Sequence, residues 1–382
     1  MNRKKLVFLT GTRADFGKLK SLISITQKSN EYEVHIFVTG MHMNSLYGST
    51  IDEIRKSGFD NIYPFINHDS IDNMDRTLAK TIDGFSHFIA EIKPDLVVVH
   101  GDRVEALAGA IVGSLNNILV AHIEGGEVSG TIDGLIRHAV SKMSHIHLVA
   151  NEESRSRLIQ LGELLKSIFI LGSPDIDLMT SNTLPSLDDV KKYYDISFLE
   201  YSIAILHPVT TESKSSKRNA KIFVDALLET NDCYVVIYPN NDFGSNDILS
   251  EYERLKDNDR FKVFPSLRFE YFLVLLKYSN YIVGNSSAGI REASFYNVPT
   301  VDIGSRQSNR SKDHSIFHTS NDCNSIIKSI SSAKNFKVIN HNQGSVFGQG
   351  SSDEMFLNLL NGEDIWSSDC QKLFQDIDYE KN

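Results

Sequence analysis

The sequence predicts an α/β protein made of two Rossmann-like, doubly wound domains that face a central cleft. Short apolar runs alternate with helical patterns, the signature of a doubly wound fold, and the alternation stops once and then restarts. The apolar runs are rich in Val, Ile and Leu without polar alternation, which is typical of strands buried on both faces of a parallel sheet. At 382 residues the chain is long enough for two cores.

The elements of the first domain, expected within residues 1–175, follow from this alternation. The predicted strands are Lys5–Thr10, Tyr32–Thr39, Asp95–His100, Ile118–Ile123, His145–Val149 and Ile168–Leu171. The predicted helices are Leu19–Lys28, Met74–Ile92, Arg103–Leu115 and Ile132–Ser144. A breaker-rich segment from Gly172 to Ser186 is expected to be a hinge.

The same alternation restarts in the second domain, expected within residues 186–350. Its predicted strands are Ser202–Leu206, Cys233–Tyr238, Phe261–Val263, Tyr281–Val283 and Thr300–Ile303. Its predicted helices are Asn219–Glu229, Phe269–Tyr278, Gly289–Tyr296 and Asn321–Ala333. In the remaining residues, 351–382, an amphipathic helix at Ser352–Leu360 is expected to pack back near the hinge.

Composition excludes several classes of partner. The net charge is −10 without a concentrated basic block, which argues against nucleic acid or an anionic membrane. Cys233, Cys323 and Cys370 are widely spaced and odd in number, so a disulfide framework or a clustered zinc site is not expected. The apolar run Leu6–Leu9 is too short for a signal peptide, and no stretch approaches the ~20 residues of a membrane span. We therefore expect a cytoplasmic protein.

Polar motifs follow six of the predicted strands. Doubly wound domains bind ligands outside the carboxyl ends of their strands, so these motifs are expected to converge on one cleft. The motifs are Gly11–Lys18, Gly101–Arg103, the turn His122–His138, His207–Val209, Pro239–Asp242 and Gly284–Ser287.

The turn after the predicted strand Ile118–Ile123 carries two acids, Glu124 and Asp133, nine residues apart. Two carboxylates in different environments can serve as a general acid and base. Helix capping explains Asp133 nearly as well, whereas Glu124 beside two glycines has no obvious structural task. Asp102 directly follows the buried run Leu96–Val99 and is expected near the cleft, although capping of the next helix is a comparable explanation.

The run Gly284-Asn-Ser-Ser-Ala-Gly is suited to bind a phosphate. Small residues at a helix start let backbone N–H groups approach an anion, although Asn and Ser are also common N-caps. Its candidate residues are Asn285, Ser286, Ser287 and Gly289. Glu292 can accept hydrogen bonds from ribose hydroxyls, or it is a solvated helical glutamate.

Cationic and histidine side chains supply further candidates. Arg13 and Lys18, in a glycine-flanked loop, can neutralise a phosphate held by the opposite domain, though surface loops often carry such residues. His207 precedes Pro208, which favours an extended backbone, and can contact either a leaving phosphate or a local carbonyl. His42 is a similar, weaker candidate. The sequence lacks the fingerprints of nicotinamide, P-loop, zinc and serine-nucleophile sites.

Taken together, these motifs resemble the UDP-N-acetylglucosamine 2-epimerases, and among them the hydrolysing branch that opens sialic acid and related nonulosonic acid biosynthesis. The non-hydrolysing bacterial branch typically has His-Val-Glu-Ala-Gly at the acidic turn. The resemblance covers most of the chain, in order, through these motifs: Gly11-Thr-Arg-Ala-Asp15, Gly101-Asp-Arg103, His122-Ile-Glu-Gly-Gly-Glu127, Arg137-His138, His207-Pro-Val-Thr-Thr211, Gly284-Asn-Ser-Ser287, Gly304-Ser-Arg-Gln307 and Phe347-Gly-Gln-Gly350.

The resemblance implies a glycosyltransferase B-type fold with UDP in the interdomain cleft. It implies conversion of UDP-N-acetylglucosamine and water to UDP and N-acetylmannosamine through a glycal intermediate, without metal or nicotinamide cofactor. By matching position, the acid/base set is Asp102, Glu124 and Asp133, and His207 attends the leaving phosphate; the other implied contacts are Arg13, Arg103, Asn240, Asp242, Ser286 and Glu292. Which carboxylate performs which step stays open.

Several alternatives also stay open. The family often carries a second acid where this chain has Gly134, so the sugar can differ, and some relatives act on UDP-2,4-diacetamido-2,4,6-trideoxyhexose. The other functional hypotheses are a non-hydrolysing epimerase, a glycosyltransferase and a non-catalytic nucleotide-sugar binder. A homodimer or homotetramer is implied by the resemblance only.

Overall fold

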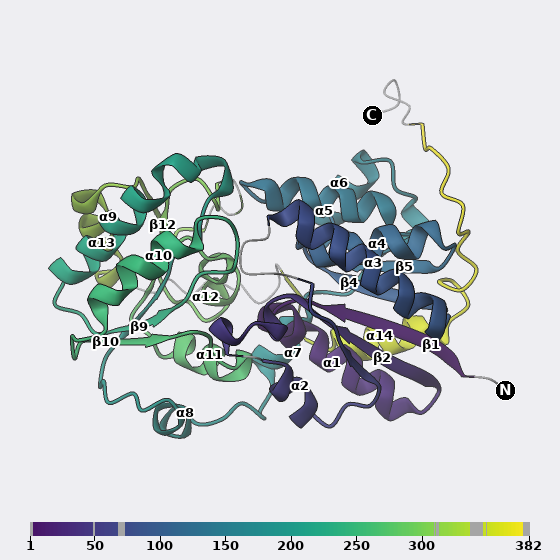
Figure 1. Ribbon diagram of the computed structural model, residues 1–382, viewed down its shortest axis with the longest axis horizontal. Helices are drawn as coiled ribbons and strands as arrows, with labels where there is room; N and C mark the ends of the chain where they lie inside the picture. The colour runs from purple at the N-terminus through teal and green to yellow at the C-terminus, as the bar shows by residue number, and fades with distance from the viewer. Residues whose placement is uncertain are drawn as a thin grey trace.

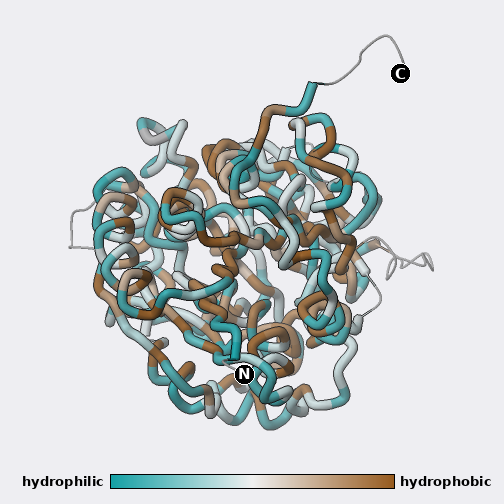
Figure 2. Tube along the Cα trace, turned by 90° about the vertical axis from the view of Figure 1, so that its right-hand side faces the viewer, coloured by the Kyte–Doolittle hydropathy of each residue, from teal (hydrophilic) through white to brown (hydrophobic). Residues whose placement is uncertain are grey.

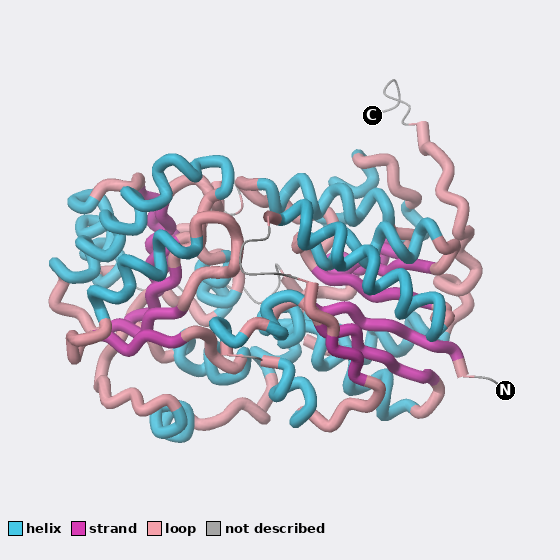
Figure 3. Tube along the Cα trace, viewed as in Figure 1, coloured by secondary structure: helices cyan, strands magenta, loops and turns pink. Residues whose placement is uncertain are grey.

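The computed structural model describes residues 3–48, 50–67, 73–308, 310, 313–336, 347–348 and 350–376. It contains two parallel β-sheets, each flanked by helices on both faces, which lie side by side (Figures 1 and 3). Apolar stretches of chain run through the middle of the molecule and hydrophilic stretches lie mostly outside (Figure 2). The predicted fold class, two doubly wound α/β domains, is confirmed.

The first sheet has seven strands in the order β3-β2-β1-β4-β5-β6-β7, all paired in parallel. The strand order reverses between β1 and β4, and such a switch point opens a crevice at the carboxyl ends of the strands. The strands are β1 (Lys4–Thr10), β2 (Tyr32–Val38), β3 (Ile62–Pro64), β4 (Leu96–His100), β5 (Leu119–Ile123), β6 (Ile146–Val149) and β7 (Ile168–Ile170).

Alternate residues of these strands enter two separate cores. One face packs against α1 (Arg13–Ser29), α2 (Ile51–Lys56) and α14 (Ser352–Asn361). The other face packs against α3 (Met74–Ile92), α4 (Val104–Leu115) and α5 (Ile132–Met143). Because both faces are buried, most of these strands contain no polar alternation, as the sequence predicted, and β2 with Glu33 and His35 is the exception. A further helix, α6 (Glu152–Gln160), packs beside β6 and β7.

The second sheet has six parallel strands in the order β10-β9-β8-β11-β12-β13. They are β8 (Ser202–Ile205), β9 (Tyr234–Ile237), β10 (Phe261–Phe264), β11 (Ile282–Gly284), β12 (Thr300–Ile303) and β13 (Ile316–Thr319). One face is covered by α9 (Ser216–Glu229), α10 (Ser245–Tyr252) and α13 (Cys323–Lys334), and the other by α7 (Pro174–Thr180), α8 (Leu187–Tyr193), α11 (Phe269–Lys277) and α12 (Glu292–Phe295).

The structure corrects several local predictions. The segment expected as a hinge contains α7 and ends at Ser186, the N-cap of α8. The helix expected at Gly289–Tyr296 is a 3₁₀ turn, Ser287–Gly289, followed by the four-residue α12. The sequence reasoning missed these elements: α2, α6, α7, α8, α10, β3 and β13. The two missed strands lie at the edges of their sheets and are only 3 and 4 residues long, too short for a periodic signal.

A capping box corrects the prediction for the first glycine-flanked motif. Thr12 caps α1 by accepting a hydrogen bond from the Asp15 backbone N–H at 3.2 Å, and the Asp15 carboxylate accepts one from the Thr12 N–H at 3.0 Å. The helix therefore begins at Arg13, and Arg13 and Lys18 lie on α1 rather than in a loop. Both side chains are thereby carried by a rigid element that starts at the carboxyl end of β1.

The C-terminal helix α14 completes the core of the first domain and also reaches the interdomain segment. Phe356 is 1% exposed and packs edge-on against Phe8 of β1, with ring centroids 6.2 Å apart. At the start of the helix, the Ser352 N–H donates to the Asp177 carboxylate of α7 at 2.9 Å. None of the described helices is long and apolar enough to cross a membrane.

Replacing Phe356 by alanine is expected to lower the free energy of unfolding by about 3–5 kcal/mol, because it leaves a cavity against β1. Denaturant unfolding followed by circular dichroism measures this change. The matched control is Phe374→Ala, since Phe374 is 82% exposed and its loss should cost less than about 0.5 kcal/mol. Equal effects of the two substitutions would contradict the role of α14 in the core.

Candidate active site

A cavity of about 280 Å³ lies between the carboxyl ends of the two sheets. Parallel α/β domains place their ligand sites at this edge. Eleven of the residues predicted for the site line the cavity: Arg13, Lys18, Asp102, Arg103, Glu124, Asp133, His207, Asn240, Ser286, Ser287 and Glu292. Residues from six different strand ends thus share one hollow, although the sequence segments that supply them are up to 279 positions apart (from Arg13 to Glu292).

Two of the predicted site residues are instead part of the packing. His42 is fully buried, and both ring nitrogens contact hydroxyl groups, those of Thr10 and Thr50. Burial lowers the pKa of His42 to about 4, so this histidine is neutral. At Gly289, a Cβ atom would lie 2.5 Å from a methyl group of Thr300, so this glycine permits close packing rather than ligand contact.

The two other predicted residues that do not line the cavity support residues that do. The side chain of Asn285 accepts a hydrogen bond from the His207 N–H at 2.6 Å and donates one to the His207 carbonyl at 2.9 Å. Asp242 forms an ion pair with Arg103 at 2.9 Å. Asn285 therefore fixes the backbone of His207, and Asp242 fixes the guanidinium of Arg103.

His207 presents a neutral ring to the cavity. Its Nδ1 accepts a hydrogen bond from the Asn240 N–H at 3.0 Å, so the proton resides on Nε2. Burial, together with the nearby Arg306 and Arg103, holds the pKa of His207 well below its usual value. The ring can therefore donate a hydrogen bond to an anion without first taking up a proton.

Arg13 carries unused hydrogen-bonding capacity at the cavity wall. One guanidinium nitrogen donates to Glu53 at 2.7 Å, while Nε and Nη1 are buried without a hydrogen-bond partner among the described residues. A buried guanidinium group that is only half satisfied is expected to bind an anion. Across the cavity, Ser286 and Ser287 form the turn after β11, where the Ser286 hydroxyl accepts from the Ala288 N–H at 3.3 Å.

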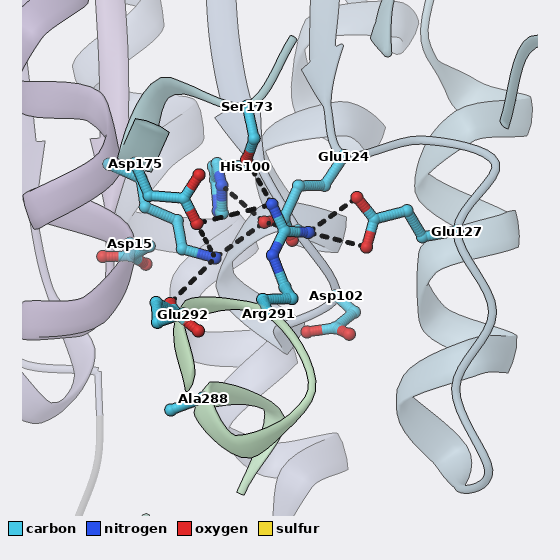
Figure 4. A network of polar contacts seen from close by, with 12 residues as sticks. Asp15, His100, Asp102, Glu124, Glu127, Ser173, Asp175, Ala288, Arg291 and Glu292 are labelled. Atoms are coloured by element: carbon cyan, nitrogen blue, oxygen red, sulfur yellow. Dashed lines mark hydrogen bonds and ion pairs between the residues drawn. The ribbon is translucent and has the colours of Figure 1, made fainter. Parts of the chain in front are cut away.

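Glu124 lies at the centre of a buried network of charges (Figure 4). Its φ of +67° is unusual for a residue other than glycine, and such backbone strain is found mostly at functional positions. The cationic or histidine groups around its carboxylate, with their distances, are Lys18 at 2.7 Å, Arg291 at 2.9 Å, Arg137 at 3.3 Å and His100 at 3.4 Å. Burial by itself raises the pKa of Glu124, but Arg291, Lys18 and His100 reverse the effect and hold it well below the usual value. Glu124 is therefore a carboxylate.

The other two predicted acids are less enclosed, and each has one arginine partner. Asp102 pairs with Arg137, the same residue that contacts Glu124. Asp133, in the first turn of α5, pairs with Arg306 of the second domain at 2.9 Å. The three carboxylates of the predicted acid/base set thus line the cavity, and two of them, Asp102 and Glu124, are linked through Arg137.

Sequence reasoning missed the arginines that hold these acids. Arg137, Arg291, Arg306 and Arg310 all line the cavity. Arg137 and Arg306 stand in motifs that resemble the family, and Arg291 lies shortly after another, but a motif does not say which side chains face a cleft. Arg310 carried no sequence signal. Among the described residues, no group of three or more His, Cys, Asp or Glu side chains is placed to hold a metal ion.

Known proteins similar to this chain point to one family. The family model described as UDP-N-acetylglucosamine 2-epimerase matches residues 25–361. A UDP-N-acetylglucosamine 2-epimerase of Neisseria meningitidis is 47% identical over 377 residues, which is 98% of this chain and 99% of the relative. A UDP-N,N'-diacetylbacillosamine 2-epimerase (hydrolyzing) of Legionella pneumophila is 33% identical and covers 94% of this chain and 95% of its own. The polysialic acid biosynthesis protein P7 of Escherichia coli is 31% identical, with 90% and 89% covered.

Solved structures match over nearly the whole chain. The UDP-GlcNAc 2-epimerase of Methanocaldococcus jannaschii, in complex with UDP-GlcNAc and UDP, has a TM-score of 0.78 at 22% identity, with 94% of this chain and 99% of that chain covered. A Neisseria meningitidis UDP-GlcNAc 2-epimerase bound to UDP-GlcNAc has a TM-score of 0.76 at 17% identity, with the same shares covered. At these identities the matches establish the fold.

Gly130 offers a test of how closely the two domains approach at the cavity. Its N–H donates to the Arg306 carbonyl of the second domain at 3.2 Å, and a Cβ atom would lie 2.4 Å from the Ser305 carbonyl oxygen. Gly130→Ala is therefore expected to push the domains apart while each stays folded, because the backbone itself is compatible with alanine. Small-angle X-ray scattering should report a larger radius of gyration.

The control for this experiment is Gly362→Ala, because a Cβ atom there would meet nothing closer than 3.4 Å. If Gly130→Ala scatters like the wild-type protein and like this control, the close interdomain contact is wrong.

Proposed function

Because the chain belongs to the UDP-N-acetylglucosamine 2-epimerase family, we propose that it is a hydrolysing UDP-N-acetylglucosamine 2-epimerase. It converts UDP-N-acetylglucosamine and water to UDP and N-acetylmannosamine. The observation that carries this proposal is the cavity itself, where the carboxylates of Asp102, Glu124 and Asp133 and several anion-binding groups line one hollow. Elimination of a diphosphate from a sugar needs both kinds of group within reach of one substrate.

The diphosphate is the leaving group, and the cavity can stabilise its charge. Nε and Nη1 of Arg13 have no hydrogen-bond partner in the part of the chain that the structure describes, and His207 offers a neutral N–H. Ser286 lies at the turn after β11, where backbone N–H groups can approach a phosphate. Preorganised donors aimed at developing charge commonly supply the largest share of rate enhancement.

The acids handle the proton at C2 of the sugar. A base takes this proton while the bond between C1 and the diphosphate oxygen breaks, which yields UDP and a glycal. Water then adds its hydroxyl to C1, and a proton is delivered to C2 on the face opposite to the one it left, so the product is free N-acetylmannosamine. Glu124 enters as a carboxylate and so starts as a proton acceptor or charge stabiliser. The proton donor is therefore another group, and Asp102 and Asp133 are the candidates at the cavity wall.

The sugar is the least constrained part of this proposal. The relative in Escherichia coli named for polysialic acid biosynthesis favours a product used for sialic acid or surface polysaccharide. The diacetylbacillosamine-specific relative favours a diacetamido sugar as the second candidate. At Gly134, a Cβ atom would lie 2.9 Å from the Ser129 carbonyl oxygen, so the acid that relatives often carry here requires this loop to move.

Incubation of the protein with UDP-N-acetylglucosamine is expected to release UDP and free N-acetylmannosamine, measured by chromatography and by NMR of the sugar. UDP-2,4-diacetamido-2,4,6-trideoxyhexose is tested in parallel, and faster UDP release from it would transfer the assignment to that sugar. Formation of UDP-N-acetylmannosamine with the nucleotide attached would instead make the enzyme non-hydrolysing. UDP binding without turnover of either sugar would refute the proposal.

Glu124→Gln is expected to lower turnover by about 100-fold or more, because it removes the charge of one acid/base group. UDP affinity, measured by calorimetry, should persist because the diphosphate contacts of Arg13 and His207 remain. The control is Glu152→Gln, whose side chain is 72% exposed on α6. Unchanged turnover of Glu124→Gln would remove Glu124 from the reaction.

A further inference from the structure

The turn after β5 carries a third acid, Glu127, which does not line the cavity. Glu127 is buried at 6% exposure and binds Arg291 of the second domain through both carboxylate oxygens, at 2.6 and 2.7 Å. Arg310, also from the second domain, approaches it at 3.3 Å. Both contacts are made by one nitrogen, Nη1, so the two carboxylate oxygens of Glu127 together fix the position of that end of the guanidinium group. Glu127 thus determines where a second-domain cation sits.

The same guanidinium group contacts Glu124. Nη1 of Arg291 lies 2.9 Å from Glu124 while it also binds Glu127, so one nitrogen serves two acids of the same turn (Figure 4). The other terminal nitrogen faces Ser173 and Asp175, which is 3.4 Å away. Arg291 therefore links the second domain to Glu124, and Glu127 binds the same nitrogen, Nη1, that contacts Glu124.

The charge balance explains why Glu127 is needed. Lys18 and Arg137 of the first domain already contact Glu124 before Arg291 is counted. A third cation brought into this buried cluster is repelled by the other two unless further anions compensate for it. Glu127 is the nearest such anion, closer than Asp175.

Resting on the proposed function, we propose that Glu127 is a positioning residue that holds Arg291 of the second domain against Glu124. Glu127 touches neither the cavity nor the substrate, and it acts through Arg291. Loss of Glu127 releases Arg291 from Glu124, and Glu124 then takes up a proton at higher pH than in the wild-type enzyme.

The direction in which the pKa of Glu124 shifts when Glu127 is neutralised shows whether Glu127 positions Arg291 or only adds a negative charge. The groups that face Glu124 or its partners are Lys18 from α1, His100 from β4, Arg137 from α5, Asp102 after β4, Asp175 from α7, and Arg291 and Glu292 from the second domain. If Arg291 stays in place when Glu127 becomes neutral, Glu124 keeps its cation and loses a neighbouring anion, so its pKa falls. If Arg291 leaves, the pKa of Glu124 rises.

The test is the pH profile of turnover for Glu127→Gln. Its acid limb is expected to move to higher pH, in step with that of Arg291→Gln, and kcat is expected to fall by about 100-fold, with a smaller change in KM. Glu127→Asp keeps the charge, so its acid limb should stay near that of the wild-type enzyme. Glu153→Gln is the control, because Glu153 is 71% exposed and should leave both kcat and the profile unchanged.

A double-mutant cycle measures the pairing independently of turnover. The effects of Glu127→Gln and Arg291→Gln on thermal unfolding are expected to be less than additive in the double variant. If Glu127→Gln does not fold, Arg291→Lys provides the same test, because lysine keeps the charge but has a single terminal nitrogen and cannot contact Glu127 and Asp175 at once, as Nη1 and Nη2 of Arg291 do. An acid limb that is unmoved or shifted to lower pH, or additive effects on unfolding, would overturn the inference.

UDP release by the wild-type protein distinguishes a failure of the proposed function from a failure of the role of Glu127. Absence of UDP release by the wild-type protein refutes the function, whereas normal wild-type turnover with an unshifted Glu127→Gln profile refutes only the role of Glu127.

Discussion

The pairing of Arg291 with the carboxylates of the first domain is the interaction on which the site depends. Arg291 is only 3% exposed, so its charge cannot be solvated and must be matched by protein groups. The acids that match it, Glu124, Glu127 and Asp175, all come from segments that precede the second sheet. The cavity between the domains and the ion pairs across them therefore depend on the same residues. A change that separates the domains also removes the counter-charges of the acid at the centre of the site.

Much of this arrangement was predictable, because a parallel sheet collects the carboxyl ends of its strands at one edge. The buried runs around Leu96–Val99 predicted β4, and Asp102 after them was therefore expected near the cleft, where the structure places it. The same reasoning placed His207 and Ser286 in the cavity. Position after a strand is a strong signal because it depends on topology and not on side-chain detail.

Other parts of the site could not be predicted for a definite physical reason. His42 and Asn285 follow strand ends as well, yet one faces internal hydroxyl groups and the other braces a neighbouring loop. Which way a polar side chain turns at a strand end depends on tertiary packing. Arg310 lies outside any strand–helix pattern, and its contact with Glu127 exists only once both domains are folded. The sequence predicts which residues lie at the carboxyl edge of the sheet, but it does not predict which charged side chains pair with one another.

The position of α14 has a consequence for the order in which the protein is made. Phe356 and Leu360 belong to the core of the first domain, although the whole second sheet precedes them in the chain. During synthesis the N-terminal sheet emerges from the ribosome without α14 on one of its faces. That face stays uncovered until the second domain and α14 have been translated. Exposed apolar surface during that interval favours aggregation, so chaperone contact is expected while α14 is still missing. The two domains are separate in architecture but are completed together.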